Sequence, residues 1–403
     1  MVTFDSLRAD HLGVYGYGRK TSDNIGQLAE KSYIFSNYIA NAPSTYLSMP
    51  SLISSKLPNK ISVVNGDSYG NISLFLLEKE ITLAKILKKA GYITVFYSAN
   101  PALFYTNFSK DFDFQFYTSG EGVEDDMLIT RKATNYLEQN KEKNFFMWVH
   151  YISPHAPYRP DYPFNESFVF DNFFDEYTNI VIDINHDSRP QEIDPDYLIA
   201  QYDGEIKFAD NEFAKLISKL DEMNLMKNTI VIVSSDHGES MTEHQNYFEH
   251  NVLYDDNLKV PLIIFDPAKQ KRKIISEQFQ GIDFVPTVLS LLDIDSPKSF
   301  EGNSVFERRN KSELAISMEN ENYISYRTNE WKLIITGNER ELFDLKADPL
   351  EKNNLISDYL HLNISSGFRE KIEDNSSSGE VEQELINPDE ELIRRLKSLG
   401  YLN

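Results

Sequence analysis

The sequence predicts an α/β fold in which helices cover both faces of a mostly parallel central sheet. Short β-branched, apolar runs alternate with helical segments along the chain, a pattern typical of parallel sheets. The clearest buried strand, residues 230–233, is followed directly by polar residues that include Asp236 and His237. After about residue 310, closely spaced strands replace this alternation of strands and helices. We therefore expect a large first domain, residues 1–310, and a small α+β subdomain with an antiparallel sheet, residues 311–403.

The composition suits a globular protein with a sizeable core. The 403 residues are 41% apolar and include 26 phenylalanines and 23 tyrosines. A formal net charge of −23 argues against nucleic acid or an anionic membrane as the main partner. The absence of cysteine excludes disulfides, thiol nucleophiles and cysteine-bound zinc.

The sequence carries no recognisable membrane or export signal. No apolar run is long enough to span a membrane, and the first residues lack the pattern of a signal peptide. As it stands, the sequence predicts a cytoplasmic protein, whereas a leader ahead of it would make the protein extracytoplasmic. The oligomeric state is left open.

The first part of the chain predicts strands separated by helices. Ser22 is a suitable N-cap for a helix that extends to Lys31, and Gly91 ends a helix whose apolar spacing begins at Ile81. A helix is expected to begin at Pro50, because proline suits the first helical position. A further helix is expected over residues 126–140. The strands of this part are expected at residues 2–4, 35–39, 93–97 and 145–152.

The middle of the chain combines a long insertion with regular elements. Residues 159–195 are rich in Asn, Asp, Phe and Pro without periodicity, and we interpret them as an insertion that shapes the substrate site. A long amphipathic helix over residues 197–225 leads into the strand at 230–233. A strand at residues 262–265 and a helix at residues 284–292 follow.

The last part of the chain predicts a small antiparallel sheet. Residues 323–328 and 331–336 form a hairpin pattern around Asn329 and Glu330, and residues 342–345 are a further short strand. Residues 362–388 are rich in Ser, Glu and Asn and are expected to be mobile. A terminal amphipathic helix is expected at residues 390–399, ended by Gly400.

Polar side chains follow two of the predicted strands where each strand ends. Asp5 follows residues 2–4, while Asp236 and His237 follow residues 230–233. Ligands of open α/β sheets bind beyond the carboxyl ends of the strands. Carboxylate and imidazole side chains together suit a divalent metal such as Ca, Mg, Mn or Zn. Three of the eight histidines fall in this part of the chain: His237, His244 and His250.

These features occur in segments that resemble the sulfatase family of the alkaline phosphatase superfamily. Phe4–Gly13 resembles the opening strand and metal-ligand turn, and Ala42–Ile53 resembles the nucleophile segment. His150–Tyr158 resembles the loop that binds the substrate anion. Their order along the chain makes the match specific. The full set of matching segments is 4–13, 42–53, 150–158, 202–206, 235–240 with 243–244 and 250, 259–264 and 341–355.

The resemblance implies a metal-dependent hydrolase of sulfate or phosphate esters, acting on a small-molecule or glycan ester. One divalent ion would be held by Asp5, Asp236 and His237. A hydroxyl bound to that ion would be acidified and would attack sulfur or phosphorus. By resemblance this nucleophile lies two residues before Pro50 and is Ser48, which would also be a metal ligand.

The resemblance also implies roles for three further histidines. His155 and His250 would bind the outer oxygens of the ester anion, although many sulfatases carry lysine where His250 stands. His244 would protonate the leaving group or orient the group that does so.

One departure from the family pattern opens an alternative. Sulfatases convert a cysteine or serine to formylglycine within the motif Cys/Ser-x-Pro-x-Arg, but Leu52 stands in place of the arginine. This departure argues against formylglycine at Ser48. Phosphodiesterases and phosphoglycerol or phosphoethanolamine transferases of the superfamily use an unmodified threonine, and Thr45 is nearby. A catalytically dead binding protein of the same fold is a third possibility, which retention of the metal-site residues argues against.

Overall fold

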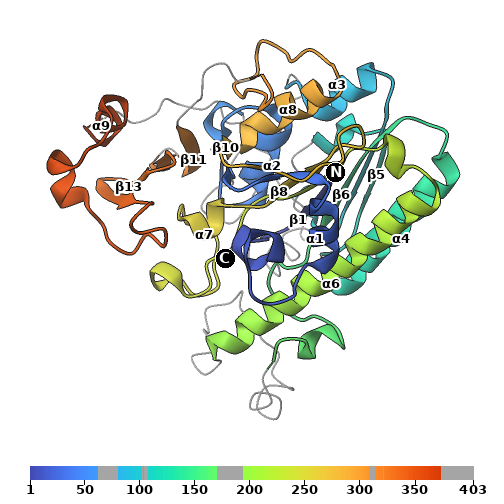
Figure 1. The fold of residues 1–403 in the computed structure, drawn as a ribbon, viewed down its shortest axis with the longest axis horizontal. Coiled ribbons are helices and arrows are strands. Elements are labelled where there is room, and N and C mark those ends of the chain that lie inside the picture. The colour runs from blue at the N-terminus through green and yellow to red at the C-terminus, as the bar shows by residue number, and fades with distance from the viewer. Residues whose placement is uncertain are drawn as a thin grey trace, which may run out of the picture.

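An eight-stranded sheet forms the centre of the molecule (Figure 1). The computed structural model describes residues 1–61, 80–101, 103, 108–120, 122–169, 194–307, 314–320 and 322–373. The strands lie in the order β5-β4-β6-β1-β7-β8-β2-β9. Their bounds are β1 (Val2–Phe4), β2 (Ser32–Phe35), β4 (Ile93–Ser98), β5 (Phe114–Tyr117), β6 (Phe145–Tyr151), β7 (Val231–Ser235), β8 (Leu262–Phe265) and β9 (Lys273–Ile275).

The sheet is mostly parallel, as predicted. The five strands from β5 to β7 all run in one direction, and β1 lies among them between β6 and β7. In the register of β1, Val2 is opposite Val149 on one side and Val233 on the other. The predicted strand 262–265 is present as β8, but it runs antiparallel to both of its neighbours, β7 and β2.

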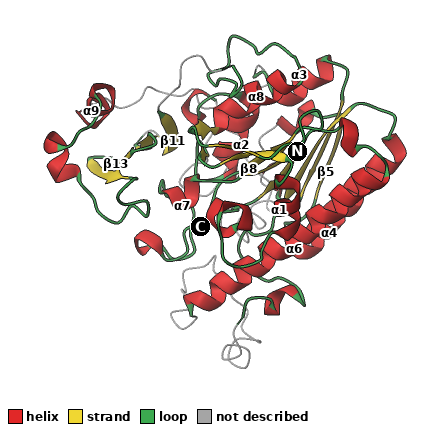
Figure 2. Cartoon of the chain, viewed as in Figure 1, coloured by secondary structure: helices red, strands yellow, loops and turns green. Residues whose placement is uncertain are grey.

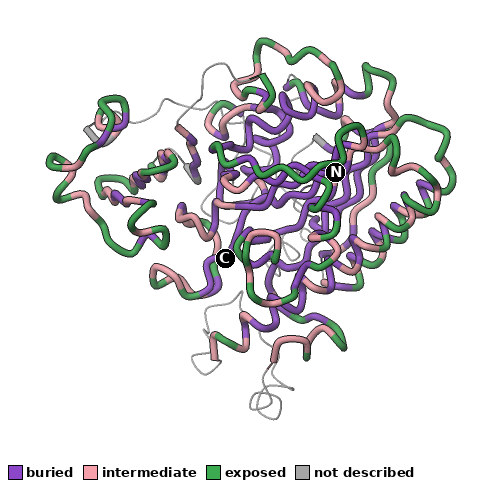
Figure 3. Tube along the Cα trace, viewed as in Figure 1, coloured by how far each residue is buried: buried purple, intermediate pink, exposed green. Residues whose placement is uncertain are grey.

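Helices cover both faces of the sheet (Figures 1 and 2). One buried apolar cluster joins the sheet to α1 (Asp23–Ala29), α4 (Val123–Asn140) and α6 (Pro195–Glu222). A second cluster joins it to α2 (Thr45–Ser54), α3 (Leu83–Lys89) and α8 (Phe284–Leu291). Figure 3 shows the buried residues concentrated along the central strands between these layers. Within the described ranges, no helix combines the length and the apolar composition needed to cross a bilayer.

The helix that carries the nucleophile segment begins earlier than predicted. α2 begins at Thr45 and contains Pro50 in its interior, so the expected start at Pro50 is wrong. Ser44 is the N-cap residue: its backbone is extended, and its carbonyl accepts hydrogen bonds from the N–H groups of Leu47 and Ser48. The preference of proline for the first helical turn is a weak signal, and these backbone hydrogen bonds outweigh it.

A four-stranded antiparallel sheet follows the central one, as predicted. It consists of β11 (Ala315–Asn320), β12 (Tyr323–Arg327), β13 (Trp331–Thr336) and β14 (Glu339–Asp344). The sequence did not predict β11. The expected single strand 35–39 is divided between β2 and β3 (Tyr38–Ile39), which pairs with β10 (Phe279–Gln280).

Several expectations fall wholly or partly outside the described residues. These are the proposed boundary at 310, most of the insertion 159–195, most of segment 362–388 and the terminal helix 390–399. Within segment 362–388, the structure has a helix, α9 (Ser366–Glu373).

A buried ionic network joins the small sheet to α7 (Asp255–Leu258). The Asp255 carboxylate accepts hydrogen bonds from the Arg327 guanidinium at 2.8 Å and from Lys332 Nζ at 2.8 Å. Lys332 is fully buried and also contacts Glu351 Oε1 at 2.8 Å. Burial alone would raise the pKa of Asp255, but Arg327 and Lys332 hold it below its ordinary value of 3.8.

Replacing Asp255 by asparagine should lower the free energy of unfolding by about 3–5 kcal/mol at neutral pH. Arg327 and Lys332 would then remain buried without the carboxylate that they share. Since the pKa of Asp255 is lowered by folding, its contribution is present above about pH 4 and is lost as the pH falls further. Denaturant unfolding at pH 7 and pH 3 measures both effects.

The matched control is Glu138→Gln, which breaks the exposed pair between Glu138 and Lys219. That change should alter the free energy of unfolding by no more than about 1 kcal/mol. Equal, small effects in both variants would show that the buried network does not stabilise the fold.

Candidate active site

Three potential metal ligands meet at the carboxyl ends of β1 and β7. Asp5 directly follows β1, and Asp236 and His237 directly follow β7. One ligand atom from each side chain lies within 4.8 Å of the others, and all three side chains are buried. Because β1 and β7 are parallel neighbours, their ends bring together residues that are far apart in the sequence.

Hydrogen bonds orient these side chains toward one point. Asp236 Oδ1 accepts the backbone N–H groups of His237 at 2.8 Å and Ser6 at 3.1 Å, which leaves Oδ2 for the cluster. His237 Nδ1 is 2.7 Å from the carbonyl oxygen of Gly238. Donation of that hydrogen bond leaves the lone pair on Nε2, the arrangement typical of histidine ligands of metals. Two carboxylates and one imidazole therefore fit a divalent cation.

Gly238 allows the chain to turn tightly beside the ligands. A Cβ atom at this position would lie 2.1 Å from the backbone oxygen of Asp256, so no other residue fits without displacing α7. The N–H of Gly238 donates to the carbonyl of Asn257 at 2.6 Å. The ligand turn is thus fixed against α7.

The hydroxyl group of Thr45 contacts all three potential metal ligands. Thr45 Oγ1 is 2.7 Å from Asp236 Oδ2, 3.4 Å from His237 Nε2 and 3.5 Å from Asp5 Oδ2. Thr45 is the first residue of α2, where the helix dipole favours negative charge.

Ser48, the predicted nucleophile, lies one helical turn later. Its hydroxyl is buried, and it has no hydrogen-bond partner in the described part of the chain. The nucleophilic role of Ser48 therefore stays a prediction, and the hydroxyl of Thr45, the first residue of α2, lies closer to the potential metal ligands.

Asn100 and His150 also contact Asp5, and neither contact was predicted. Asn100, which follows β4, places Nδ2 2.5 Å from Asp5 Oδ2. His150, at the end of β6, has Nε2 3.4 Å from the same oxygen. Both residues follow or end strands at the carboxyl edge of the sheet, but the sequence alone does not give the order of those strands.

The histidines at the site keep Asp5 ionised. Burial would raise the pKa of the Asp5 carboxyl, but His155, His150 and His237 together lower it below its ordinary range. In turn, burial lowers the pKa of His155, despite the nearby Asp5. The site therefore combines a buried carboxylate with imidazoles that favour its charged form.

Of the three histidines assigned by resemblance to the ester, two lie at this site. The His250 ring is 5.1 Å from the His237 ring and 5.4 Å from the His155 ring, measured between centroids. His244 is placed differently: its backbone has a φ of 54°, and its ring stacks on Tyr254 at 3.6 Å. The Tyr254 hydroxyl donates to Glu341 of the small sheet at 2.8 Å. His244 thus forms part of the contact between its loop and that sheet.

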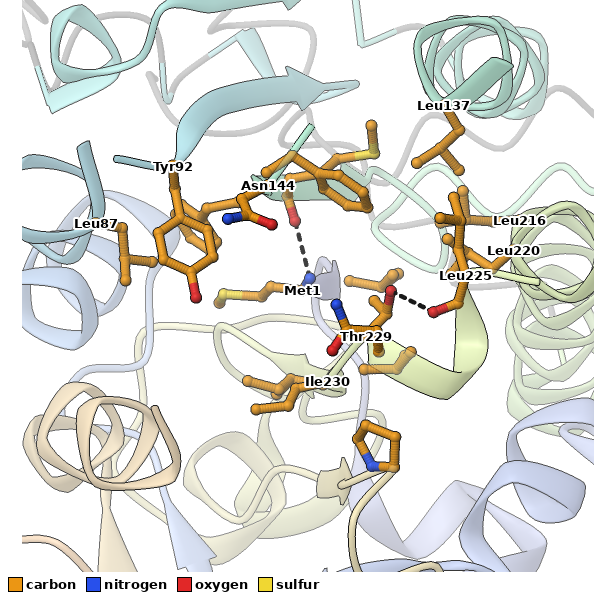
Figure 4. Close-up of a pocket in the computed structure, with 18 of the residues that line it drawn as sticks. Met1, Leu87, Tyr92, Leu137, Asn144, Leu216, Leu220, Leu225, Thr229 and Ile230 are labelled. Carbon is orange, nitrogen blue, oxygen red and sulfur yellow. Dashed lines mark hydrogen bonds between the residues drawn. The ribbon is translucent and has the colours of Figure 1, made fainter. Parts of the chain in front are cut away.

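A separate cavity of about 470 Å³ lies at the amino ends of the strands (Figure 4). Met1, Leu87, Tyr92, Leu137 and other mainly apolar side chains line it. The amino group of Met1 donates a hydrogen bond to the carbonyl of Met147 at 2.8 Å. The cluster around Asp5 lies at the opposite, carboxyl ends of the strands. It holds the polar side chains that are suited to chemistry.

Comparison with known proteins gives one family along most of the chain. The family profile described as "Sulfatase" matches residues 1–294, and that described as "N-sulphoglucosamine sulphohydrolase, C-terminal" matches residues 242–378. An arylsulfatase of Clostridium perfringens is 24% identical, with 93% of this chain and 91% of that protein covered. A Delta 4,5-hexuronate-2-O-sulfatase of Bacteroides thetaiotaomicron is 23% identical, with 98% and 93% covered.

A solved structure shares the architecture. The phosphonate monoester hydrolase of Agrobacterium radiobacter superposes with a TM-score of 0.76 at 16% identity. The superposition covers 92% of this chain and 94% of that one. At this level of identity the likeness establishes a common fold.

Proposed function

Because the chain belongs to the sulfatase family, we propose that it is a metal-dependent hydrolase of sulfate or phosphate-type esters with Thr45 as its nucleophile. One observation carries the proposal: the Thr45 hydroxyl lies 2.7 Å from Asp236 Oδ2, among the side chains of Asp5, Asp236 and His237. These three residues would hold a divalent cation. When bound, such an ion neutralises oxygens of the ester and acidifies a hydroxyl ligand.

The residues of the chain divide the reaction into two displacements. Thr45 Oγ1 gives up its proton to solvent and attacks sulfur or phosphorus; its new bond forms as the bond to the leaving oxygen breaks, and that oxygen takes a proton from solvent to leave as the alcohol. Water then attacks the Thr45 ester, releases the inorganic or phosphonate anion and restores the hydroxyl. The positive end of the α2 dipole favours the negative oxygens during both displacements. His155 and His250 bind the outer oxygens of the anion.

The identity of the nucleophile favours phosphorus over sulfur. If Thr45 takes the first position of the formylglycine motif, Leu47 and Met49 stand where proline and arginine belong. The Cβ atom of threonine also carries a methyl group, so its oxidation would give a ketone in place of the aldehyde. A threonyl sulfate lacks the second Cβ hydroxyl with which a hydrated aldehyde expels sulfate. A threonyl phosphate or phosphonate needs no second Cβ hydroxyl, because water attacks phosphorus and frees the threonine side chain. Since one relative is named for a hexuronate sulfate, a glycan ester belongs among the substrates to test.

Four esters of one chromogenic alcohol test this proposal. Purified protein, supplied separately with Mg, Mn, Ca or Zn, is assayed with the aryl sulfate, phosphomonoester, phosphodiester and phosphonate monoester. We expect the highest kcat/KM with one of the phosphorus esters. Intact-mass and peptide mass spectrometry should find Thr45 unmodified. Turnover of the sulfate alone would overturn the preference for phosphorus, and no turnover of any ester would overturn the hydrolase assignment.

A further inference from the structure

We propose that Asp126 and Glu205 form a carboxylate clamp that positions His155 for binding the ester anion. The clamp holds the two ends of the loop Ile152–Arg159, which carries His155 in its middle. The proposal rests on the proposed function, because His155 is given its anion-binding role there. Asp126 and Glu205 are positioning residues that act through the loop.

Asp126 holds the start of the loop. It lies in the first turn of α4 and is fully buried. Its Oδ1 accepts the backbone N–H of Ile152 at 2.8 Å, and its Oδ2 accepts that of Ser153 at 3.1 Å. The carboxylate therefore bridges two consecutive N–H groups directly after β6. Without it, two buried donors would lose their partner.

Glu205 holds the end of the loop. It lies in α6, and its Oε1 accepts the backbone N–H of Arg159 at 2.7 Å. The adjacent residue, Gly204, allows α6 to approach the chain beyond the loop, since a Cβ there would be 2.7 Å from the carbonyl oxygen of Phe164. Between the two ends, the buried ring of Tyr158 meets the ring of Tyr202 edge-on at 5.5 Å.

Internal hydrogen bonds transmit this restraint to His155. The backbone N–H of His155 donates to the carbonyl of Ile152 at 2.8 Å. The ring atom Nδ1 lies 2.6 Å from the carbonyl oxygen of Ala156. Both contacts join His155 to residues of the clamped loop, so its ring orientation depends on where that loop is held.

The clamp is energetically unfavourable as a purely structural device. Burial raises the pKa of Asp126 to about 7 and raises that of Glu205 well above its ordinary value, to which the charge of Asp126 contributes. Among the described residues, neither carboxylate forms a salt bridge with a cation. Two acids whose ionised forms are disfavoured by burial are typical of a place where geometry is maintained at the expense of stability.

A matched pair of carboxylates tests the role of Asp126. Asp210 is also buried and likewise bridges two consecutive N–H groups, those of Asn24 at 2.9 Å and Ile25 at 2.8 Å, but these belong to α1. We expect Asp126→Asn to raise KM and lower kcat/KM about 10–100-fold, as a misplaced binding group does. Asp210→Asn should lower the melting temperature comparably while changing kcat/KM no more than about twofold.

A double-mutant cycle tests whether Asp126 acts through His155. If it does, Asp126→Asn should cost little further activity in a His155→Ala background, since the group that it positions is already absent. Glu205→Gln should follow the same pattern. Multiplicative losses in the double variants, or an equal loss of kcat/KM in Asp210→Asn, would overturn the clamp.

Calorimetric binding of inorganic phosphate and sulfate to the metal-loaded protein separates this proposal from the proposed function. The measurement needs no turnover. We expect Asp126→Asn to weaken anion binding about 10-fold or more and Asp210→Asn to leave the anion affinity unchanged. If no ester is hydrolysed but anion binding still weakens in this way, the clamp stands and the hydrolase assignment falls. Undiminished anion affinity in Asp126→Asn, or a wild-type protein that binds neither anion, would overturn the clamp.

Discussion

Replacing Thr45 by alanine is expected to lower kcat by about 10⁴-fold or more on the best ester. In subtilisin, removal of the nucleophile alone lowers kcat by about 2 × 10⁶-fold, because a nucleophile acts as one unit with the groups around it. The hydroxyl 2.7 Å from Asp236 Oδ2 would be lost, whereas the three metal ligands would remain. Steady-state kinetics, metal content and thermal unfolding of the purified variant measure these effects.

Two further variants test whether the loss of activity is specific to the Thr45 hydroxyl. Thr45→Ser keeps a hydroxyl at the same position and should retain much of the activity. Ser48→Ala should lower kcat only a few-fold, because the Ser48 hydroxyl has no hydrogen bond to the cluster among the described residues. An active Thr45→Ala variant together with an inactive Ser48→Ala variant would return the nucleophile to Ser48.

Removal of divalent cations is expected to abolish turnover and to lower the melting temperature. Asp5 and Asp236 would then face each other buried without the ion that their arrangement fits. A metal that binds only the folded state stabilises it by RT ln(1 + [M]/Kd), about 4 kcal/mol at a concentration 1,000 times Kd. Chelation followed by separate addition of Mg, Mn, Ca and Zn, with activity and melting temperature recorded, identifies the ion.

The rise of the melting temperature on adding metal should disappear in Asp236→Asn and persist in Asp203→Asn. Asp236→Asn should be inactive, and its melting temperature should not respond to added metal. Asp203→Asn changes a different buried carboxylate, which binds His11 and Arg19, and should be less stable yet still respond. A metal response in Asp236→Asn equal to that of the wild type would contradict the proposed ligand set.

The parts of the fold and site that depend on local pattern were predictable from the sequence. The apolar runs of β1 and β7 both end in acidic residues, and the parallel α/β pattern brings such ends together. The position of α2 was predicted incorrectly, since α2 begins at Thr45, five residues before the predicted start at Pro50. The nucleophilic role of Ser48 rests on its place two residues before Pro50 and stays a prediction, while the hydroxyl of Thr45 lies beside Asp236.

Other features depend on tertiary structure that the sequence does not reveal. Asn100 and His150 meet Asp5 only because β6 lies beside β1 and β4 lies on the other side of β6 in the sheet order. His244 and His250 both follow His237 closely in the sequence, but the His244 ring stacks on Tyr254 whereas the His250 ring lies 5.1 Å from the His237 ring. The sequence does not reveal this difference, because it depends on how the loop folds.

The central place of β1 has a consequence for synthesis on the ribosome. Val2 is made well before its partners in the sheet, Val149 and Val233. At 5–20 residues per second, β1 would wait on the order of 10–50 s before β7 has been translated. During that time β1 lacks β7 as a neighbour, and Asp5 and Asp236 cannot meet. The cluster of Asp5, Asp236 and His237 can thus form only after β7 has been made, and a nascent chain that ends before β7 cannot assemble it.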